Sequence, residues 1–423
     1  MSKKVFTVAI CGCGARGADT YGALCSQMQD KYQIVSLLDP NSVKLEKYGK
    51  QFGVENHALF SDEEQFFAEK RADLLIIGTL DAEHTRQCIK ALSLGYDVLL
   101  EKPITDKRED CEKILQAQKK YGGKVLVCHV LRYAPAFLKI AKLLDEGVVG
   151  RLVAIQAIER VGFWHQAHSY VRGNWRRREE TTPMILAKCC HDLDLLQFYA
   201  NSKCKSISSI GDLTYFKAEN APDGAAKRCL DCKYVDTCAY SAKRIYIQWW
   251  HESNERDHWP QTVLTTQSPL SEEIITRALQ DGPYGRCVFA CDNDVVDHQL
   301  VEMTFENGVK ASLTMTAFTA TTGRIISFFG TQGELVLDET EDCIKIRPFN
   351  DKETIVPFGN LNEQGYGHGG GDYGLITTLY DILSGKETCR TSLDSSIESH
   401  LMGICAEESR LQGGKLIYLH EKA

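Results

Sequence analysis

The first third of the chain alternates short apolar runs with polar segments long enough to form helices. The apolar runs lie at residues 5–10, 34–38, 74–77, 98–100 and 125–128. Strands that are separated by crossovers of about a dozen residues or more pair in parallel, with helices on both faces of the sheet. The alternation therefore predicts a doubly wound α/β domain over residues 1–128.

After residue 128 the expected strands follow one another, several of them through glycine turns. They lie at 152–158, 204–213, 300–305, 309–318, 324–330 and 334–337, and helices are expected at 184–199, 373–383 and 395–412. Strands that succeed one another without intervening helices favour antiparallel pairing. We therefore predict a second, α+β domain over residues 129–423, whose C-terminal helix is free to pack back on the first domain.

Charge and cysteine content restrict the partners and the compartment. The net charge is -8, whereas nucleic-acid binding needs a basic face that releases phosphate counterions. No run approaches the roughly 20 apolar residues of a membrane helix, and the apolar stretch at the N-terminus is too short for a signal peptide. The 17 cysteines lack disulfide-framework spacing, which fits a reducing compartment. We expect a cytoplasmic protein with no nucleic-acid or membrane partner.

A glycine-rich loop follows the first expected strand directly. Its glycines permit a tight turn and let backbone amides approach a pyrophosphate at the start of a helix. Asp39 ends the second strand about 20 residues further on, where a carboxylate accepts hydrogen bonds from the adenosine ribose hydroxyls. The pattern predicts a dinucleotide site formed by Gly12, Gly14, Ala15, Arg16, Gly17 and Asp39.

The same residues bear on which dinucleotide is bound. The carboxylate of Asp39 would repel a 2′-phosphate, so the sequence favours NAD over NADP. Arg16 weakens this preference for NAD, because its guanidinium could face either a 2′-phosphate or the pyrophosphate.

The strand at 98–100 runs straight into Glu101, Lys102 and Pro103. Proline fixes its own φ and restricts the residue before it, so the backbone that carries Lys102 has few conformations. Open α/β sheets bind ligands at the carboxyl edge of their strands. We therefore expect the ammonium group of Lys102 to point at a ligand.

The order of the segments CGCGARG, LLD, IIGTLDAEH, LSLGYDVLLEKPIT and VCHVLRYAPAF closely resembles the glucose-fructose oxidoreductase/inositol dehydrogenase (Gfo/Idh/MocA) family. GGGD at 369–372 and EESRLQGG at 407–414 extend the resemblance over nearly the entire chain. It implies a Rossmann domain, a second domain on a large open, mostly antiparallel sheet, a nicotinamide cofactor, and usually a sugar, cyclitol or polyol substrate. It also implies a cis proline after Lys102 and a homodimer or homotetramer.

Further site residues follow from the resemblance. It implies cofactor contacts for Thr79, Asp81, His84, Glu101 and Lys102, and substrate contacts for His129, Arg132 and Tyr133.

The family's second catalytic segment reads roughly GGGxLxDxGxH, and His191 matches its histidine. The aspartate position falls on Ala187, and Lys188 adds a charge that the pattern does not require; Lys188 and Asp192 are expected at the substrate. A neutral imidazole suits a base for a hydroxyl proton, and an ammonium group stabilises an alkoxide. We therefore predict that Lys102 and His191 are catalytic.

An aromatic and basic segment at 163–178 is a further substrate candidate. Aromatic faces beside polar groups suit a pyranose ring, while arginines could grip an anion or form a solvated loop. The expected contacts are Trp164, His165, His168, Arg172 and Trp175, together with His368 from a C-terminal loop.

Cys229, Cys232 and Cys238 are spaced CxxCx5C in a polar segment. Thiolates so spaced can bind a structural zinc, which needs four ligands. The fourth could come from Cys204, His251, Cys287 or Cys291, and the spacing does not choose among them. An iron–sulfur cluster and three free thiols are the alternatives.

Three functions remain open from the sequence. The leading one is an NAD(P)-dependent oxidoreductase that oxidises a secondary hydroxyl of a sugar or polyol, or reduces the ketone. The rival is an NAD-dependent glycosidase that works by transient oxidation, elimination and re-reduction, with no net NADH. The third is a sensor that binds NAD without turnover, against which the presence of both Lys102 and His191 argues.

Overall fold

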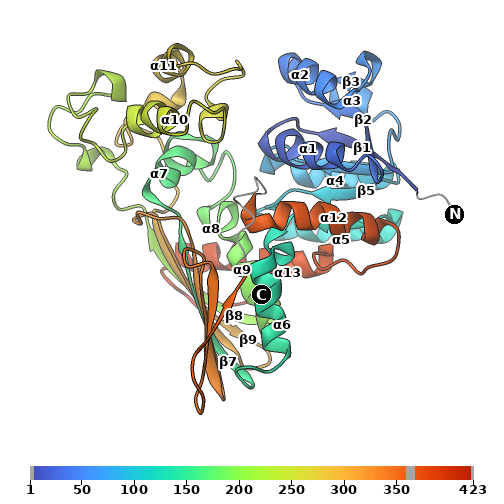
Figure 1. Cartoon of the computed structure of the whole chain (residues 1–423), viewed down its shortest axis with the longest axis vertical. Helices are drawn as coiled ribbons and strands as arrows, with labels where there is room; N and C mark the ends of the chain where they lie inside the picture. The colour runs from blue at the N-terminus through green and yellow to red at the C-terminus, as the bar shows by residue number, and fades with distance from the viewer. Residues whose placement is uncertain (1–3, 359–366, 421–423) are drawn as a thin grey trace.

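The computed structural model describes residues 4–358 and 367–420, and two sheets dominate it (Figure 1). The first sheet has six strands in the order β3-β2-β1-β4-β5-β6, and every neighbouring pair is parallel. This order confirms the doubly wound prediction and is that of a Rossmann fold. The strands are β1 (Phe6–Cys11), β2 (Tyr32–Leu38), β3 (Leu59–Phe60), β4 (Leu74–Ile77), β5 (Asp97–Leu100) and β6 (Val125–Val127).

The strands of this sheet are buried on both faces, as their continuous apolar runs require. Along β1, Val8 and Ile10 pack with α1 (Ala23–Gln27) and α12 (Gly371–Leu383). Ala9 and Cys11 instead face α4 (His84–Ser93) and α5 (Arg108–Tyr121). The other helices of this lobe are α2 (Ser42–Phe52) and α3 (Glu63–Phe66).

The second sheet has nine strands in the order β14-β13-β12-β11-β7-β10-β9-β8-β15. Among the described strands of this sheet, β7 and β10 are the one parallel pair, so the expected mostly antiparallel sheet is confirmed. The strands are β7 (Leu152–Arg160), β8 (Cys204–Asp212), β9 (His298–Phe305), β10 (Lys310–Thr316), β11 (Gly323–Gly330), β12 (Gly333–Asp338), β13 (Cys343–Pro348), β14 (Thr354–Pro357) and β15 (Ile417–Tyr418).

Three helices cover one face of this sheet: α6 (Pro135–Asp145), α9 (Cys190–Ala200) and α13 (Leu393–Leu411) (Figure 1). The strands expose apolar side chains elsewhere, with Val153 at 46%, Ile210 at 55% and Leu300 at 45% of their surface. The expected homodimer or homotetramer stays a prediction. No helix among the described residues combines the length and the apolar character needed to cross a bilayer.

The helix expected at 184–199 is interrupted. It forms α8 (Met184–Ala187) and α9, with the break at Lys188 and Cys189. The side chain of Lys188 turns towards buried Glu159, with Nζ 2.9 Å from Oε1. Lys188 is therefore held by an ion pair at the point where the two helices meet.

The C-terminal part of the chain returns to the first domain. Leu375, Ile376 and Leu379 of α12 belong to the core around β1, and Leu393 and Ile397 of α13 belong to the core on the opposite face of that sheet. The two lobes therefore share helices rather than meeting through a linker.

Two segments at 161–183 and 213–297, which we call the insertions, pack into a small separate core that includes Val171, Tyr246, Trp250 and Leu279. They carry α7 (Phe163–His165), α10 (Trp249–Glu252) and α11 (Glu272–Asp281), which stand above the second sheet in Figure 1. The sequence analysis did not foresee α10 and α11.

Candidate active site

The glycine loop after β1 is packed too closely to admit side chains at two of its positions. Gly12 has φ +91°, and a Cβ there would lie 2.7 Å from the carbonyl carbon and oxygen of Gly78. A Cβ on Gly17 would lie 2.0 Å from the carbonyl oxygen of Gly12. A Cβ on Gly14 would meet nothing within 4 Å. The loop is therefore tight against β4 but open at Gly14, as a phosphate cradle requires.

Asp39 is 6% exposed and fixes the same loop. Its Oδ2 accepts a hydrogen bond from the amide of Cys13 at 2.8 Å, and its Oδ1 accepts one from the amide of Asn41 at 2.9 Å. A carboxylate has about four lone-pair sites, so acceptor capacity remains for ribose hydroxyls.

Arg16 turns inward, towards two carboxylates rather than towards a phosphate position. Its Nε lies 2.8 Å from Glu101 Oε1 and its Nη2 lies 2.6 Å from Asp372 Oδ1. The hydroxyl of Tyr21 also donates to Glu101 Oε1 at 2.6 Å. Burial alone would raise the pKa of Asp372, but Arg16 and His368 lower it below its ordinary value. Arg16 thus joins the glycine loop to the turn after β5 and to α12.

Lys102 follows β5, and its peptide bond to Pro103 is cis, as the family resemblance implies. Its Nζ donates a hydrogen bond to the carbonyl of Ala187 at 3.0 Å. Ala187 ends α8, and the last carbonyls of a helix lack partners within it. An ammonium group has three donors, so two remain for a ligand. At the position of the family's aspartate, a backbone carbonyl therefore holds the lysine.

His191 lies in a group of buried imidazoles. Its ring centroid is 6.0 Å from that of His129 and 5.7 Å from that of His368. Its Nδ1 is buried and makes no hydrogen bond within the described part of the chain. Burial, and then the charge of Lys102, lower the pKa of His191 well below its ordinary value. The imidazole is therefore neutral at physiological pH.

His368 has a carboxylate partner at the site. Its Nδ1 lies 2.9 Å from Oδ2 of Asp372, the residue that also binds Arg16. The side chain of His368 is 37% exposed, whereas that of Asp372 is 2% exposed. Asp372 therefore orients an imidazole that solvent can reach.

A buried charge network underlies the site. Glu159 of β7 lies between Lys188, at 2.9 Å, and Arg324 of β11, whose Nη2 is 3.0 Å from Oε2. Arg324 Nε also lies 2.8 Å from Asp192 Oδ1. Burial, together with Glu159, raises the pKa of Asp192. The network neutralises Lys188, and Asp192 is a partner of Arg324 in it.

An aromatic wall extends from the insertions. Trp164 and His165 stack, with centroids 5.5 Å apart and planes at 26°, and Trp259 lies 5.3 Å from Trp164 and 5.1 Å from His165. Burial lowers the pKa of His165, and Lys188 and Lys102 lower it further. Sequence analysis missed Trp259, although a tryptophan before a proline in a polar stretch was a usable signal.

The predicted residues after β4 contact other parts of the protein. Asp81 Oδ2 accepts hydrogen bonds from Trp175 Nε1 at 3.2 Å and from Thr182 Oγ1 at 3.0 Å, which joins the lobes. His84 Nδ1 is 2.7 Å from the carbonyl of Pro103 and its Nε2 is 3.2 Å from that of Thr79. These residues shape the turn that carries Lys102.

Four residues predicted at the substrate are occupied by internal partners. Arg132 is 4% exposed and forms a two-pronged ion pair with Asp194. The hydroxyl of Tyr133 lies 3.1 Å from Thr391 Oγ1. His168 Nδ1 lies 2.8 Å from the hydroxyl of Tyr246. The fourth is Arg172, which lies in the cysteine-lined cavity of the insertions.

Of the four possible fourth ligands, Cys287 lines the same cavity as Cys229, Cys232 and Cys238. Cys291 lies next to it, with Sγ 3.3 Å from the carbonyl of Cys287. His251 pairs instead with Glu255 and Glu272. As the described side chains stand, no group of three or more Cys, His, Asp or Glu could hold a metal ion.

Two family models match the chain. The model described as "Oxidoreductase family, NAD-binding Rossmann fold" matches residues 6–129. The model described as "Oxidoreductase family, C-terminal alpha/beta domain" matches residues 141–348.

The individual proteins that resemble the chain share a low sequence identity with it. YteT of Bacillus subtilis (strain 168) is 24% identical over 405 residues, which are 90% of this chain and 92% of YteT. The 2,7-anhydro-N-acetylneuraminate hydratase of Mediterraneibacter gnavus is 22% identical over 264 residues, 62% of this chain and 65% of the hydratase. The structure of the WlbA dehydrogenase from Bordetella pertussis in complex with NADH and UDP-GlcNAcA has a TM-score of 0.70 at 16% identity and covers 100% of both chains. This last likeness shows the fold alone.

Proposed function

The chain belongs to the Gfo/Idh/MocA family of oxidoreductases, whose N-terminal domain is an NAD-binding Rossmann fold, and from that membership we propose its reaction. It oxidises a secondary hydroxyl of a sugar, a sugar derivative or a polyol with NAD, or reduces the matching ketone. The observation that carries the proposal is the Lys102 ammonium group, which is held by the Ala187 carbonyl beside the neutral His191.

The residues of the glycine loop fit a dinucleotide. The loop accepts no Cβ at Gly12 or Gly17 and is open at Gly14, so its backbone amides can approach a pyrophosphate. Asp39 retains acceptor capacity for ribose hydroxyls and would repel a 2′-phosphate, and Arg16 is engaged by Glu101 and Asp372. These contacts support NAD rather than NADP. When bound, NAD supplies the acceptor for a hydride.

The side chains at the edge of the first sheet and in the aromatic wall bind the substrate and transfer its proton. Lys102 uses its spare donors to position the substrate hydroxyl and to stabilise the developing alkoxide. His191 takes the hydroxyl proton at Nε2, because its Nδ1 is buried. His368, oriented by Asp372, exchanges that proton with solvent. Trp164 and Trp259 offer aromatic faces to the apolar side of a sugar ring.

A redox-neutral reaction is the second candidate. Transient oxidation, elimination beside the new ketone and re-reduction need additional proton transfers, and the site offers two acid–base groups, His191 and the His368–Asp372 pair. One relative is named as a hydratase of an anhydro sugar, and adding water consumes no electrons overall. Such a reaction would make this chain an NAD-dependent glycosidase or a closely related enzyme.

One experiment tests both candidates. The protein is incubated with NAD and a panel of polyols, sugars and glycosides, and NADH absorbance and released sugar are followed in parallel. NADH formed in proportion to the oxidised product supports the dehydrogenase. Sugar release that depends on NAD without net NADH supports the redox-neutral reaction. Binding of NAD with turnover of no panel member contradicts both and leaves the sensor.

A further inference from the structure

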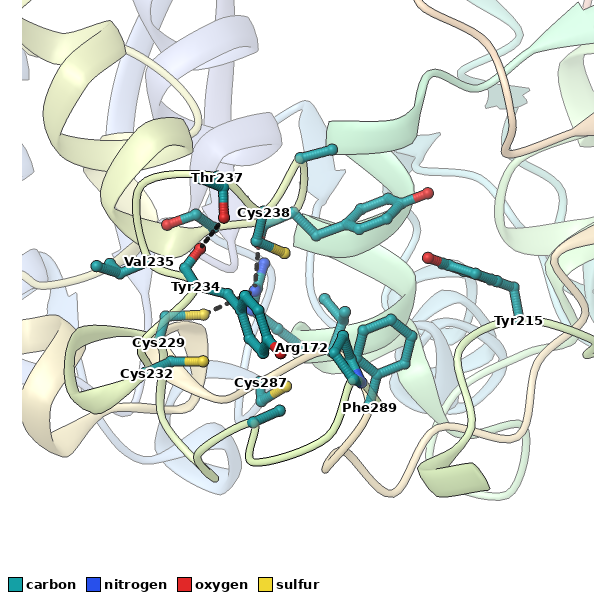
Figure 2. Close-up of a pocket in the computed structure, with 16 residues that line it drawn as sticks. Arg172, Tyr215, Cys229, Cys232, Tyr234, Val235, Thr237, Cys238, Cys287 and Phe289 are labelled. Carbon is teal, nitrogen blue, oxygen red and sulfur yellow. Dashed lines mark hydrogen bonds between the residues drawn. The ribbon is translucent and has the colours of Figure 1, made fainter. Parts of the chain in front are cut away.

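The insertions enclose a cavity of about 260 Å³ that Lys102 and His191 do not line. Cys229, Cys232, Cys238 and Cys287 all line it. Figure 2 shows their sulfur atoms gathered around the side chain of Arg172, with the cysteines coming from two separate stretches of chain. Sequence alone offered three of these cysteines and four possible partners, and the fold brings Cys287 to them.

Arg172 supplies an independent indication that something anionic belongs here. It is 1% exposed. Its Nε donates to the carbonyl of Arg286 at 2.7 Å, and its Nη2 donates to the carbonyl of Tyr240 at 2.7 Å and to Cys229 Sγ at 3.4 Å. Its Nη1 is buried and has no hydrogen-bond partner among residues 4–358 and 367–420.

No carboxylate pairs with this guanidinium within the described residues, where its hydrogen bonds run to two carbonyls and a sulfur. A buried ion without a counterion costs several kcal/mol. Four neutral thiols do not remove this cost. Four thiolates around a divalent metal carry a net charge of about -2, and metal-bound sulfur accepts hydrogen bonds from nearby N–H groups.

We propose that Cys229, Cys232, Cys238 and Cys287 bind a soft metal centre as thiolates, with Arg172 as its buried counterion. Binding releases the thiol protons and leaves the oxidation states of the sulfurs unchanged. The centre would connect the segment at 229–238 to the segment around Cys287 and so stabilise the insertion core, against which Trp164 of the aromatic wall packs.

Two occupants share this chemistry. A single zinc ion would require the thiols to close in, because their present arrangement holds no metal-binding group within the described residues. An iron–sulfur cluster is itself several ångström across and would use the cavity between them. The metal content of the protein distinguishes the two.

The full-length protein is purified without chelator and without oxygen, and zinc, iron and acid-labile sulfide are measured. We expect either about one zinc per chain or about four iron and four sulfide per chain. Cys287→Ser should reduce the content at least tenfold, and Arg172→Gln should also reduce it. Cys343→Ser, at a cysteine of β13 outside the cavity, is the matched control and should keep the full content.

A second measurement avoids variants that fail to fold. Chelator-treated wild-type protein is labelled with iodoacetamide under native conditions, with and without added Zn²⁺ or ferrous iron and sulfide, and the labelled peptides are quantified. Metal should protect the four cavity cysteines and leave Cys343 unprotected. Folded protein that contains no metal and whose four cysteines are labelled equally with and without both additions would overturn the proposal. Neither readout depends on activity, so it can fail while the proposed reaction stands.

Discussion

His400 of α13 supports the turn that carries Lys102. Its protonation state makes the free energy of unfolding depend on pH. The ring is fully buried. Its Nε2 accepts a hydrogen bond from the amide of Ile104 at 2.8 Å, and its Nδ1 donates to the carbonyl of Ser396 at 2.8 Å. An imidazolium could not accept from Ile104, so these contacts require the neutral ring. Burial, with a smaller contribution from His129, lowers the pKa of His400 to about 3.

The direction in which pH changes the stability follows from comparing the protonation of His400 in the folded and unfolded states. An unfolded histidine has a pKa of about 6.5. At about pH 7.5 the ring is neutral in both states. At about pH 5.5 the unfolded chain binds a proton here and the folded protein does not, so the free energy of unfolding falls. One pH unit below the pKa of the unfolded state, His400 lowers the free energy of unfolding by about 1.4 kcal/mol.

The assay compares wild type with His400→Gln, which cannot titrate in this range. Urea unfolding is measured at both pH values by fluorescence and circular dichroism. Between them, wild type should lose about 1.4 kcal/mol more stability than the variant. His57→Gln, at an exposed histidine, controls for the substitution itself. Equal pH dependence of wild type and His400→Gln would refute the reasoning, because it would mean that His400 binds its proton equally well in both states.

Three further substitutions test the glycine loop, Asp39 and the ion pair between Arg16 and Asp372. Gly12→Ala places a Cβ 2.7 Å from the backbone of Gly78 and should abolish NADH binding measured by fluorescence titration; normal affinity would show that the loop is not the cradle. Asp39→Ala should weaken NAD binding about tenfold, or about 1.4 kcal/mol, and reduce the preference over NADP; a wild type that binds NADP more tightly would contradict the NAD assignment. Asp372→Asn leaves Arg16 with one carboxylate and should lower the free energy of unfolding by about 2–3 kcal/mol, below the full cost of breaking a buried pair because Arg16 is partly exposed; an unchanged urea midpoint would contradict it.

The elements that the sequence predicts well are those whose pattern is local. β4 and β6 are continuous apolar runs, and β1, β2 and β5 are mostly apolar, so these strands can be predicted without tertiary information. β3, with two residues, cannot. The helix break at Lys188 and Cys189 is also not predicted, because the sequence there contains no glycine or proline that would signal an end.

In the candidate site, too, the sequence predicts the features with a local pattern and misses those that depend on distant residues. The glycine loop and the Lys102 turn are contiguous motifs with a mechanical meaning, and the structure places them at one edge of the sheet. Arg324 and His400 reach the site from distant segments, and a lone arginine in a strand or histidine in a helix carries no local signal. Arg172 shows the opposite case, because its place in an aromatic and basic segment suggested substrate, whereas the fold turns it into the cysteine-lined cavity.

Lys102→Met gives the most direct test of the central claim, that the ammonium group held by Ala187 acts on a substrate hydroxyl beside a bound dinucleotide. With a substrate found in the panel, turnover by the variant is measured alongside its dissociation constant for NADH. The account predicts a loss of turnover of about 100- to 1,000-fold, the usual effect of removing one donor to a developing oxyanion, with NADH binding retained. Turnover within about tenfold of wild type would contradict it, since the hydroxyl would then need no donor from this lysine.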